Sequence, residues 1–231
     1  MPPLTFIPTE REDHRSVTAR KKREVMRARI LRAIMDLYSD PSKISTSIED
    51  VAREAEISRG TFYKHFASLD EALIAVGREV TDQMTQDMLP IYDAVTDPVN
   101  RVSTGLRLFL TRALTDHRWA AFVLRAELVA QESVLLTYLM KDLRDGALDG
   151  VMEFDNLQAA VDSVMGATVE GIRTILLKRT KYPAQYIDSA IRITLRGLAV
   201  EKRRALKATE TSRELVAGLP ESVRQTWRVG A

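Results

Sequence analysis

Hydrophobic residues recur every three or four positions along most of this 231-residue chain, the spacing that places them on one face of an α-helix. No stretch of useful length shows the alternation of polar and apolar residues that is typical of a β-strand. The sequence therefore predicts an all-α protein. The pattern places its helices at about residues 20–38, 47–55, 58–66, 68–90, 98–115, 119–130, 133–148, 153–179 and 183–206.

Two short helices joined by a tight turn are predicted within Thr46–Phe66, TSIEDVAREAEISRGTFYKHF. Thr46 and Ser47 are each followed three residues later by a carboxylate, which is the spacing of a capping box at a helix start. The apolar pattern is then interrupted, and Ser58 offers a cap for the second helix.

The second of these short helices has one apolar and one polar side. Phe62 and Phe66 lie four residues apart and share a side, while Arg59 and Tyr63 share another. Because so short a helix is not stable alone, the two phenylalanines must pack against neighbouring helices. The polar side is then held outward, which is how a helix-turn-helix protein reads DNA.

The segment Thr46–Phe66 resembles the DNA-binding segment of the tetracycline-repressor (TetR) family of bacterial transcription regulators, most specifically in SIEDVA and ISRGTFYKHF. The preceding ILRAIMDLYSD, residues 30–40, fits the family's first helix. The resemblance implies a three-helix helix-turn-helix DNA-binding domain over residues 20–67 and a larger helical ligand-binding and dimerisation domain over residues 68–231. Residues 1–19 lack periodicity and are expected to form a mobile arm.

The resemblance also implies which residues contact double-stranded DNA. It assigns base or near-base contacts to Arg59, Gly60, Thr61 and Lys64. It assigns phosphate contacts mainly to Thr46, Ser47, Tyr63 and His65. These residue types suit the roles, since arginine can bond a guanine edge twice and hydroxyls at helix starts suit phosphate oxygens. Two residues depart from the family: Glu56 replaces a usual turn glycine, and Leu69 replaces a commonly basic residue.

The last two long helices, at about 153–179 and 183–206, carry apolar residues on more than one side. One side can pack within the subunit and another against a partner. The resemblance implies a homodimer in which each subunit contributes these two helices, and a larger monomeric core is the alternative. A twofold dimer would read a near-palindromic operator with half-sites about 34–36 Å, or a multiple, apart.

A small-molecule effector site is implied by the resemblance, because the family works as a ligand-controlled switch. Apolar bulk and a few polar groups occur on successive helices, a composition expected of a mostly apolar pocket. The candidate residues are Trp119, Phe122, Arg125, Tyr138 and Met165. Such residues at helical spacing also build ordinary cores. If they line a pocket, the ligand is hydrophobic or amphipathic, and Arg125 is available to an anion.

Composition agrees with a DNA-binding protein. Residues 20–66 carry 11 basic against 7 acidic residues, whereas residues 67–195 carry 13 against 18. The electrostatic attraction of the basic segment would direct that end of the protein to DNA, and the acidic segment would keep the rest away. Uneven charge is, however, common on helical proteins. A DNA-packaging protein without sequence preference is the alternative function.

Other function classes find little support in the sequence. The chain has no cysteine, three histidines and no glycine-rich phosphate loop, so we expect neither an enzyme nor a metal site nor a cofactor. It has no long apolar stretch of the kind that spans a membrane, so we expect no membrane association and a cytoplasmic location.

Overall fold

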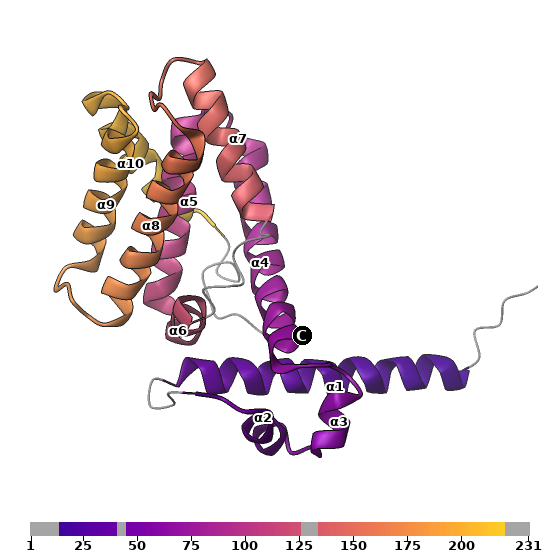
Figure 1. Ribbon diagram of the computed structural model, residues 1–231. Helices are drawn as coiled ribbons and strands as arrows, with labels where there is room; N and C mark the ends of the chain where they lie inside the picture. Colours follow the sequence, from indigo (N-terminus) through magenta and orange to yellow (C-terminus); the bar gives the residue numbers. More distant parts are fainter. Residues whose placement is uncertain (1–13, 41–44, 126–133, 220–231) are drawn as a thin grey trace, which may run out of the picture.

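A computed structural model describes residues 14–40, 45–125 and 134–219 of the chain, and these residues form helices without a strand. Figure 1 shows a small head of three helices, a long helix that rises from it, and a taller body. The helices are α1 His14–Ser39, α2 Ile48–Glu54, α3 Arg59–Tyr63, α4 Leu69–Ala94, α5 Pro98–Thr115, α6 His117–Arg125, α7 Val134–Leu148, α8 Leu157–Leu176, α9 Pro183–Gly197 and α10 Lys202–Ala217. The all-α prediction is confirmed.

Several helix boundaries differ from the sequence prediction; α3 ends at Tyr63 and not at 66, and α8 spans Leu157–Leu176 and not 153–179. Helix α1 begins at His14, so only residues 1–13 of the expected arm remain beyond it, and these lie outside the described residues. Helix α4 continues through Pro90, which is exposed, for one more turn. The single final helix predicted at 183–206 is two helices, α9 and α10. Residues 126–130, predicted to extend α6, also lie outside the described residues.

Three helix ends use a residue other than glycine in the left-handed backbone region. Glu56 after α2, Lys178 after α8 and Ala199 after α9 have φ values of 49°, 52° and 58°. At each end the next two amides bond back in the pattern of a Schellman motif, as in Ile57 N to Ala52 O at 2.8 Å. Glycine is the usual residue at this position because it has no Cβ to clash. The break between α9 and α10 therefore has Ala199 at the position where a glycine would usually mark the end of a helix.

Replacing Glu56 by glycine is expected to raise the free energy of unfolding by about 0.5–1 kcal/mol, because the strained backbone conformation is relieved. The change also removes an exposed ion pair with Arg29, which contributes little. The measurement is urea unfolding followed by circular dichroism. In the control Glu54→Gly, glycine replaces the last residue of α2, where it relieves no left-handed conformation, and should lower stability by up to about 1 kcal/mol. Equal destabilisation by both changes would contradict the prediction.

Helix α5 forms the centre of the body and packs against α7, α8, α9 and α10. Its buried Arg107 joins α5 to two of these helices: Nη2 donates to Asp188 Oδ1 of α9 at 2.6 Å, and Nε donates to Ser212 Oγ of α10 at 2.8 Å. Burial opposes ionisation of Asp188, but hydrogen bonds from Arg107 and Arg213 outweigh it and lower the pKa of the carboxyl group.

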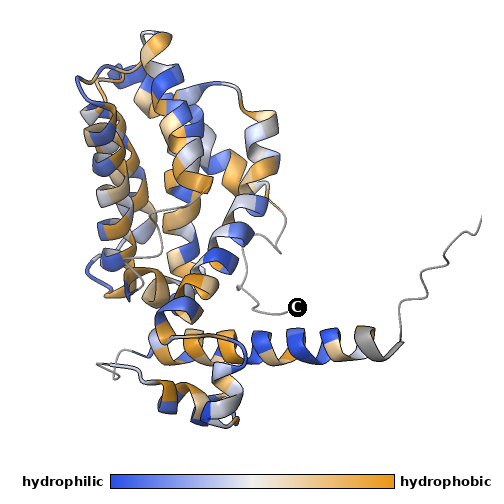
Figure 2. Cartoon of the chain, turned by 45° about the vertical axis from the view of Figure 1, so that its right-hand side comes forward, coloured by the Kyte–Doolittle hydropathy of each residue, from blue (hydrophilic) through white to orange (hydrophobic). Residues whose placement is uncertain are grey.

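Figure 2 shows that each helix of the body carries both hydrophilic and hydrophobic residues.

Candidate DNA-binding head, effector cavity and dimer face

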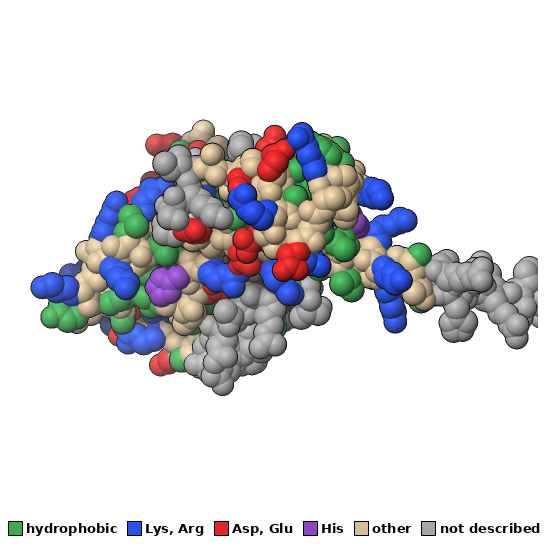
Figure 3. Space-filling view, turned by 90° about the horizontal axis from the view of Figure 1, so that it is seen from below, with side chains coloured by type: hydrophobic (Ala, Val, Ile, Leu, Met, Phe, Trp, Pro, Cys, Tyr) green, Lys and Arg blue, Asp and Glu red, His purple; other side chains and the backbone are tan. Residues whose placement is uncertain are grey.

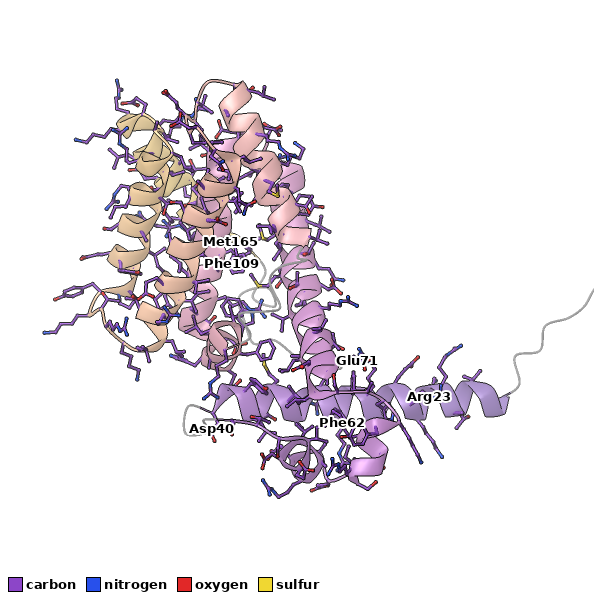
Figure 4. All side chains as sticks on the ribbon, in the orientation of Figure 1. Arg23, Asp40, Phe62, Glu71, Phe109 and Met165 are labelled. Atoms are coloured by element: carbon purple, nitrogen blue, oxygen red, sulfur yellow. The ribbon has the colours of Figure 1, made fainter. Side chains whose placement is uncertain are left out.

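The recognition helix α3 is held in the head by two buried rings. Phe62 and Phe66 are 0% and 3% exposed, and their ring centroids lie 5.9 Å apart. The Arg27 guanidinium of α1 lies 5.3 Å from the centroid of the Phe66 ring. The predicted burial of both phenylalanines is therefore confirmed, and Figure 4 shows Phe62 between α3 and α1.

Both short helices begin where the sequence predicts. The Ser47 hydroxyl accepts from Asp50 N at 3.2 Å, and the Asp50 carboxylate accepts from Ser47 N at 3.0 Å, which completes a capping box. Hydrogen bonds from the Ser47 hydroxyl, at 2.7 Å, and then from the Ser47 amide lower the pKa of the Asp50 carboxyl group. On α3 the Ser58 hydroxyl accepts from Thr61 N at 3.0 Å. The caps fix the orientation of the turn between α2 and α3.

The outward side of α3 is polar and linked to α2. Arg59 lies over the ring of Tyr63, with 5.6 Å between the guanidinium and the ring centroid, and pairs with Glu49 at 2.7 Å. The hydrogen bond to Tyr63 and the charge of Glu49 raise the pKa of Arg59, so its charge is retained. Gly60, Tyr63 and Lys64 are exposed, while Thr46, Thr61 and His65 are partly buried.

Basic side chains extend beyond α3. Arg20, Lys21, Lys22 and Arg23 are exposed on the part of α1 that projects past the rest of the head in Figure 1. Figure 3 shows Lys and Arg side chains at both ends of the underside of the molecule, with Asp and Glu gathered nearer its middle. His65 lies near this charge: burial, and then Arg23, Arg27 and Lys64, lower the pKa of its imidazole.

Helix α6 joins the head to the body. The Arg125 guanidinium donates to the backbone oxygens of Tyr38 and Asp40 at 3.0 and 2.7 Å. Ser39 Oγ donates to the Arg118 backbone oxygen at 2.9 Å. Because residues 118 and 125 are seven positions apart, they share the side of α6 that faces α1. The C-terminal end of α1 is thus fixed to the body through this helix.

The other side of α6 lines an elongated cavity in the body. The cavity has a volume of about 240 Å³ and is bounded mainly by apolar side chains of α4, α5, α6, α7 and α8. The buried Trp119 and Phe122 of α6 belong to its wall, as does Met165 of α8, which lies beside Phe109 in Figure 4. Within the described residues the indole N–H of Trp119 has no hydrogen-bond partner, so an acceptor on a ligand would satisfy it.

The cavity has one charged end, which sequence reasoning missed. Its wall includes Tyr92 of α4, Arg101 of α5 and Asp142 of α7. The Tyr92 hydroxyl bonds Asp142 Oδ2, and Arg101 Nη1 lies 3.4 Å from Asp142 Oδ1. Burial raises the pKa of Asp142, and burial together with Asp142 also raises the pKa of Tyr92. Each residue comes from a different helix, so no local motif marks the group.

Two of the five residues expected at the effector site lie outside the cavity wall. Arg125 is absent from the cavity wall because it donates to backbone oxygens of α1, so the structure does not place it where it could receive an anionic ligand. Tyr138 packs against Tyr92, with ring centroids 4.5 Å apart. Arg125 lies three residues after Phe122 on neighbouring positions of α6, so its contacts with α1, and not helical spacing, decide where its side chain lies.

The outer sides of α8 and α9 carry exposed small and apolar residues. Ile193 is 73% exposed, and a Cβ added at Gly166 would meet no atom within 4 Å. Leu177 and Tyr182, at the connection between the two helices, are also more than half exposed. We call Gly166, Leu177, Tyr182 and Ile193 the α8–α9 face. Figure 1 shows α8 and α9 at one side of the body, away from α4.

Within the described residues, a capped helix-turn-helix head on a helical body defines an all-α protein of the helix-turn-helix class. Residues 30–76 match the family model described as bacterial regulatory proteins, tetR family. Over these residues the chain is similar to this family. The match covers α1 from Ile30, both short helices and the first part of α4. None of the described helices has the length and apolar character needed to cross a membrane.

Two curated relatives are helix-turn-helix regulators. The transcriptional regulator HbdR of Aromatoleum sp. (strain CIB) is 33% identical over 86 residues, 37% of this chain and 38% of that protein. The transcriptional repressor Rv3405c of Mycobacterium tuberculosis (strain ATCC 25618 / H37Rv) is 31% identical over 106 residues, 44% of this chain and 55% of that protein. The chain thus matches about two fifths to just over half of the length of these relatives.

The similarity of fold extends further along the chain. The crystal structure of RolR in complex with its ligand resorcinol has a TM-score of 0.63 and 22% sequence identity. The comparison covers 82% of this chain and 95% of RolR. The body that follows the helix-turn-helix head therefore has the same architecture as that of RolR.

Proposed function

We propose that the protein is a ligand-responsive transcriptional regulator, a repressor that binds a near-palindromic operator as a homodimer and is released by a small, mainly hydrophobic molecule. The observation that carries the proposal is α3, whose buried Phe62 holds Arg59 and Tyr63 outward on a capped helix-turn-helix. The similarity of residues 30–76 to the tetR family of bacterial regulatory proteins, and the repressor Rv3405c among the relatives, support the same function. Such a protein works on DNA in the cytoplasm and is not an enzyme.

The connection between ligand and DNA is supported by the two sides of α6. Trp119 and Phe122 line the cavity, while Arg118 and Arg125 contact the end of α1. A molecule that moves the cavity side of this nine-residue helix also moves its contacts with the head. Release from DNA requires that the ligand bind the altered arrangement more tightly than the DNA-bound one.

The homodimer is supported by the α8–α9 face. Large apolar side chains that stay exposed on α9 and at the connection between α8 and α9 favour an interaction surface, and Gly166 leaves room for a partner helix to approach closely. Because one short recognition helix reads only a few base pairs, a symmetric pair is needed for an operator of useful specificity.

The test of sequence-specific binding compares Arg59→Ala with Tyr63→Phe. Arg59→Ala should relax the base preference and cost about 1–3 kcal/mol at one operator position, because it removes a base contact. Tyr63→Phe should weaken binding to operator and scrambled DNA equally, since a phosphate contact carries no sequence information. The measurement is fluorescence anisotropy at fixed salt, with an operator selected from genomic fragments.

The alternative, DNA packaging without sequence preference, predicts a different outcome of the same titration. The parent protein would then bind operator and scrambled DNA with the same affinity and a steep salt dependence. A specific regulator should prefer its site by about 10³–10⁷-fold. Unchanged binding by both variants would exclude the roles assigned to Arg59 and Tyr63.

Operator affinity should rise as the pH falls from about 7.5 to 5.5, because of His65. Its pKa is lowered in the free protein by burial and nearby cations, and a DNA phosphate beside it would raise that pKa. Between the two pKa values binding takes up a proton, so affinity increases with acidity by at most about tenfold per pH unit. His65→Gln should remove this increase in operator affinity. The control His117→Gln changes a residue of α6, away from the helix-turn-helix, and should retain the increase.

A further inference from the structure

We propose that the effector is a neutral, mainly apolar molecule that carries a hydroxyl group, and that this hydroxyl binds at Asp142 and Arg101. The inference rests on the proposed function and specifies the ligand of the same cavity. It differs from the sequence expectation, in which Arg125 would receive an anion, because Arg125 is engaged by backbone oxygens of α1 and is not part of the cavity wall.

The charges at the cavity end favour a neutral ligand. Asp142 and Arg101 have side chains only 2% and 15% exposed, and they form an ion pair across α5 and α7. Their charges balance, so an anionic ligand would meet the carboxylate and a cationic ligand would meet the guanidinium. Away from water neither repulsion is screened well. An ionised ligand would also lose its own hydration on entering the apolar cavity.

The hydrogen bonds at this end leave both a donor and an acceptor for the ligand. Within the residues that the structure describes, each oxygen of the Asp142 carboxylate accepts one bond, from Tyr92 and from Arg101, although two carboxylate oxygens can accept about four. With the same residues, the five N–H groups of Arg101 make three bonds, to Val95 O, Tyr92 O and Asp142. A hydroxyl donates one bond and accepts others, so it suits the carboxylate and the guanidinium together.

Rigid packing keeps the charged end in place. Arg101 donates to the backbone oxygens of Val95 and Tyr92 at 2.5 and 3.1 Å, and its guanidinium lies 4.6 Å from the centroid of the Tyr92 ring. Tyr138 supports the other side of the same ring. The group is therefore ordered before a ligand arrives, which limits the entropy lost on binding.

The rest of the cavity fixes the size and character of the molecule. Beyond the charged end its wall is formed by apolar side chains that include Met84, Met88, Phe109, Leu139 and Met165. A dry apolar cavity of about 150 Å³ holds benzene. The volume of about 240 Å³ therefore suits a substituted single ring or a branched chain of comparable size.

The test uses three probes of matched shape: 4-propylphenol, its methyl ether 4-propylanisole, and 4-propylbenzoate. Binding to the full-length protein is measured by isothermal titration calorimetry at pH 7.5, without DNA. The phenol should bind about tenfold or more tightly than the ether, which cannot donate to Asp142. The benzoate should bind weakest. Equal affinities of phenol and ether, or tightest binding of the benzoate, would overturn the proposal.

The variant Asp142→Asn provides a sharper result, since it leaves the positive charge of Arg101 uncompensated. In this variant the order of the probe affinities should reverse, so that the benzoate binds more tightly than the phenol. Tyr138→Phe, a change just behind Tyr92, is the matched control and should keep the parent's order. Far-ultraviolet circular dichroism and thermal unfolding confirm that both variants are folded. If Asp142→Asn does not fold, Asp142→Glu is used instead. Because it keeps the carboxylate charge, the benzoate should still bind weakest, and tightest binding of the benzoate to this variant would overturn the proposal.

A separate measurement distinguishes failure of the inference from failure of the proposed function. The same probes are added to the protein–operator complex. Tight binding of the phenol without release of DNA would leave the assignment of the cavity standing and contradict the ligand-controlled switch. Release of DNA by the benzoate alone would support the switch and overturn the assignment.

Discussion

Ile193→Glu is expected to convert the protein into a monomer and to lower its operator affinity by about 10³-fold or more, towards the level of non-specific binding. Ile193 is 73% exposed on α9, within the α8–α9 face. In a symmetric dimer the substitution introduces two carboxylates, one from each subunit, into an apolar contact where neither has a partner. Sedimentation velocity and operator titration at the same protein concentrations provide the measurement.

The control for this change is Ile74→Glu. Ile74 is also a large exposed apolar residue, but it lies on α4, away from the α8–α9 face. This variant should sediment as the parent does. If Ile193→Glu remains dimeric, or if both variants dissociate alike, the partner surface must lie elsewhere. A monomer that still bound the operator tightly would contradict the need for two recognition helices.

The head was largely predictable from the sequence because its determinants are local. Ser47 and Ser58 cap helices three residues away, and Phe62 and Phe66 are four residues apart. Such short-range patterns fix both the helix starts and the buried side of α3. The same reasoning could not show that Glu49 pairs with Arg59, since that contact depends on how α2 and α3 cross.

The body was less predictable because its important contacts are not local. Tyr92, Arg101 and Asp142 come from three helices, and up to 50 residues separate the members of the group. The break after α9 was missed because Ala199 adopts a conformation that the sequence pattern reserves for glycine. Three of the five expected cavity residues line its wall, but helical spacing alone could not tell which sides of α6 and α7 face inward.

The second large effect is expected at Arg112 and Asp87, which join α5 to α4 inside the body. Arg112 Nη1 donates to Asp87 Oδ2 at 2.9 Å, and the two side chains are only 5% and 7% exposed. Gln83 also donates to Asp87, and the guanidinium lies 5.8 Å from the centroid of the Trp119 ring. The pair therefore lies between the helix that carries the head and the wall of the cavity.

Arg112→Met should lower the free energy of unfolding by about 3–5 kcal/mol, because Asp87 is left as a buried charge without its cation. Asp87→Leu should cost a similar amount by isolating Arg112. The double variant should recover most of the loss, since apolar residues of similar volume often replace a buried ion pair at little net cost. Chemical denaturation of all four proteins completes a double-mutant cycle, and strictly additive losses would contradict direct coupling.

The double variant also separates stability from geometry. Its recovered stability would come from apolar packing, which is non-directional, whereas the ion pair fixes one position of α4 relative to α5. We therefore expect the double variant to unfold near the parent's denaturant midpoint but to bind the operator more weakly, because α4 connects the head to the body. Parental operator affinity at parental stability would show that the Asp87–Arg112 pair stabilises the body without orienting the head.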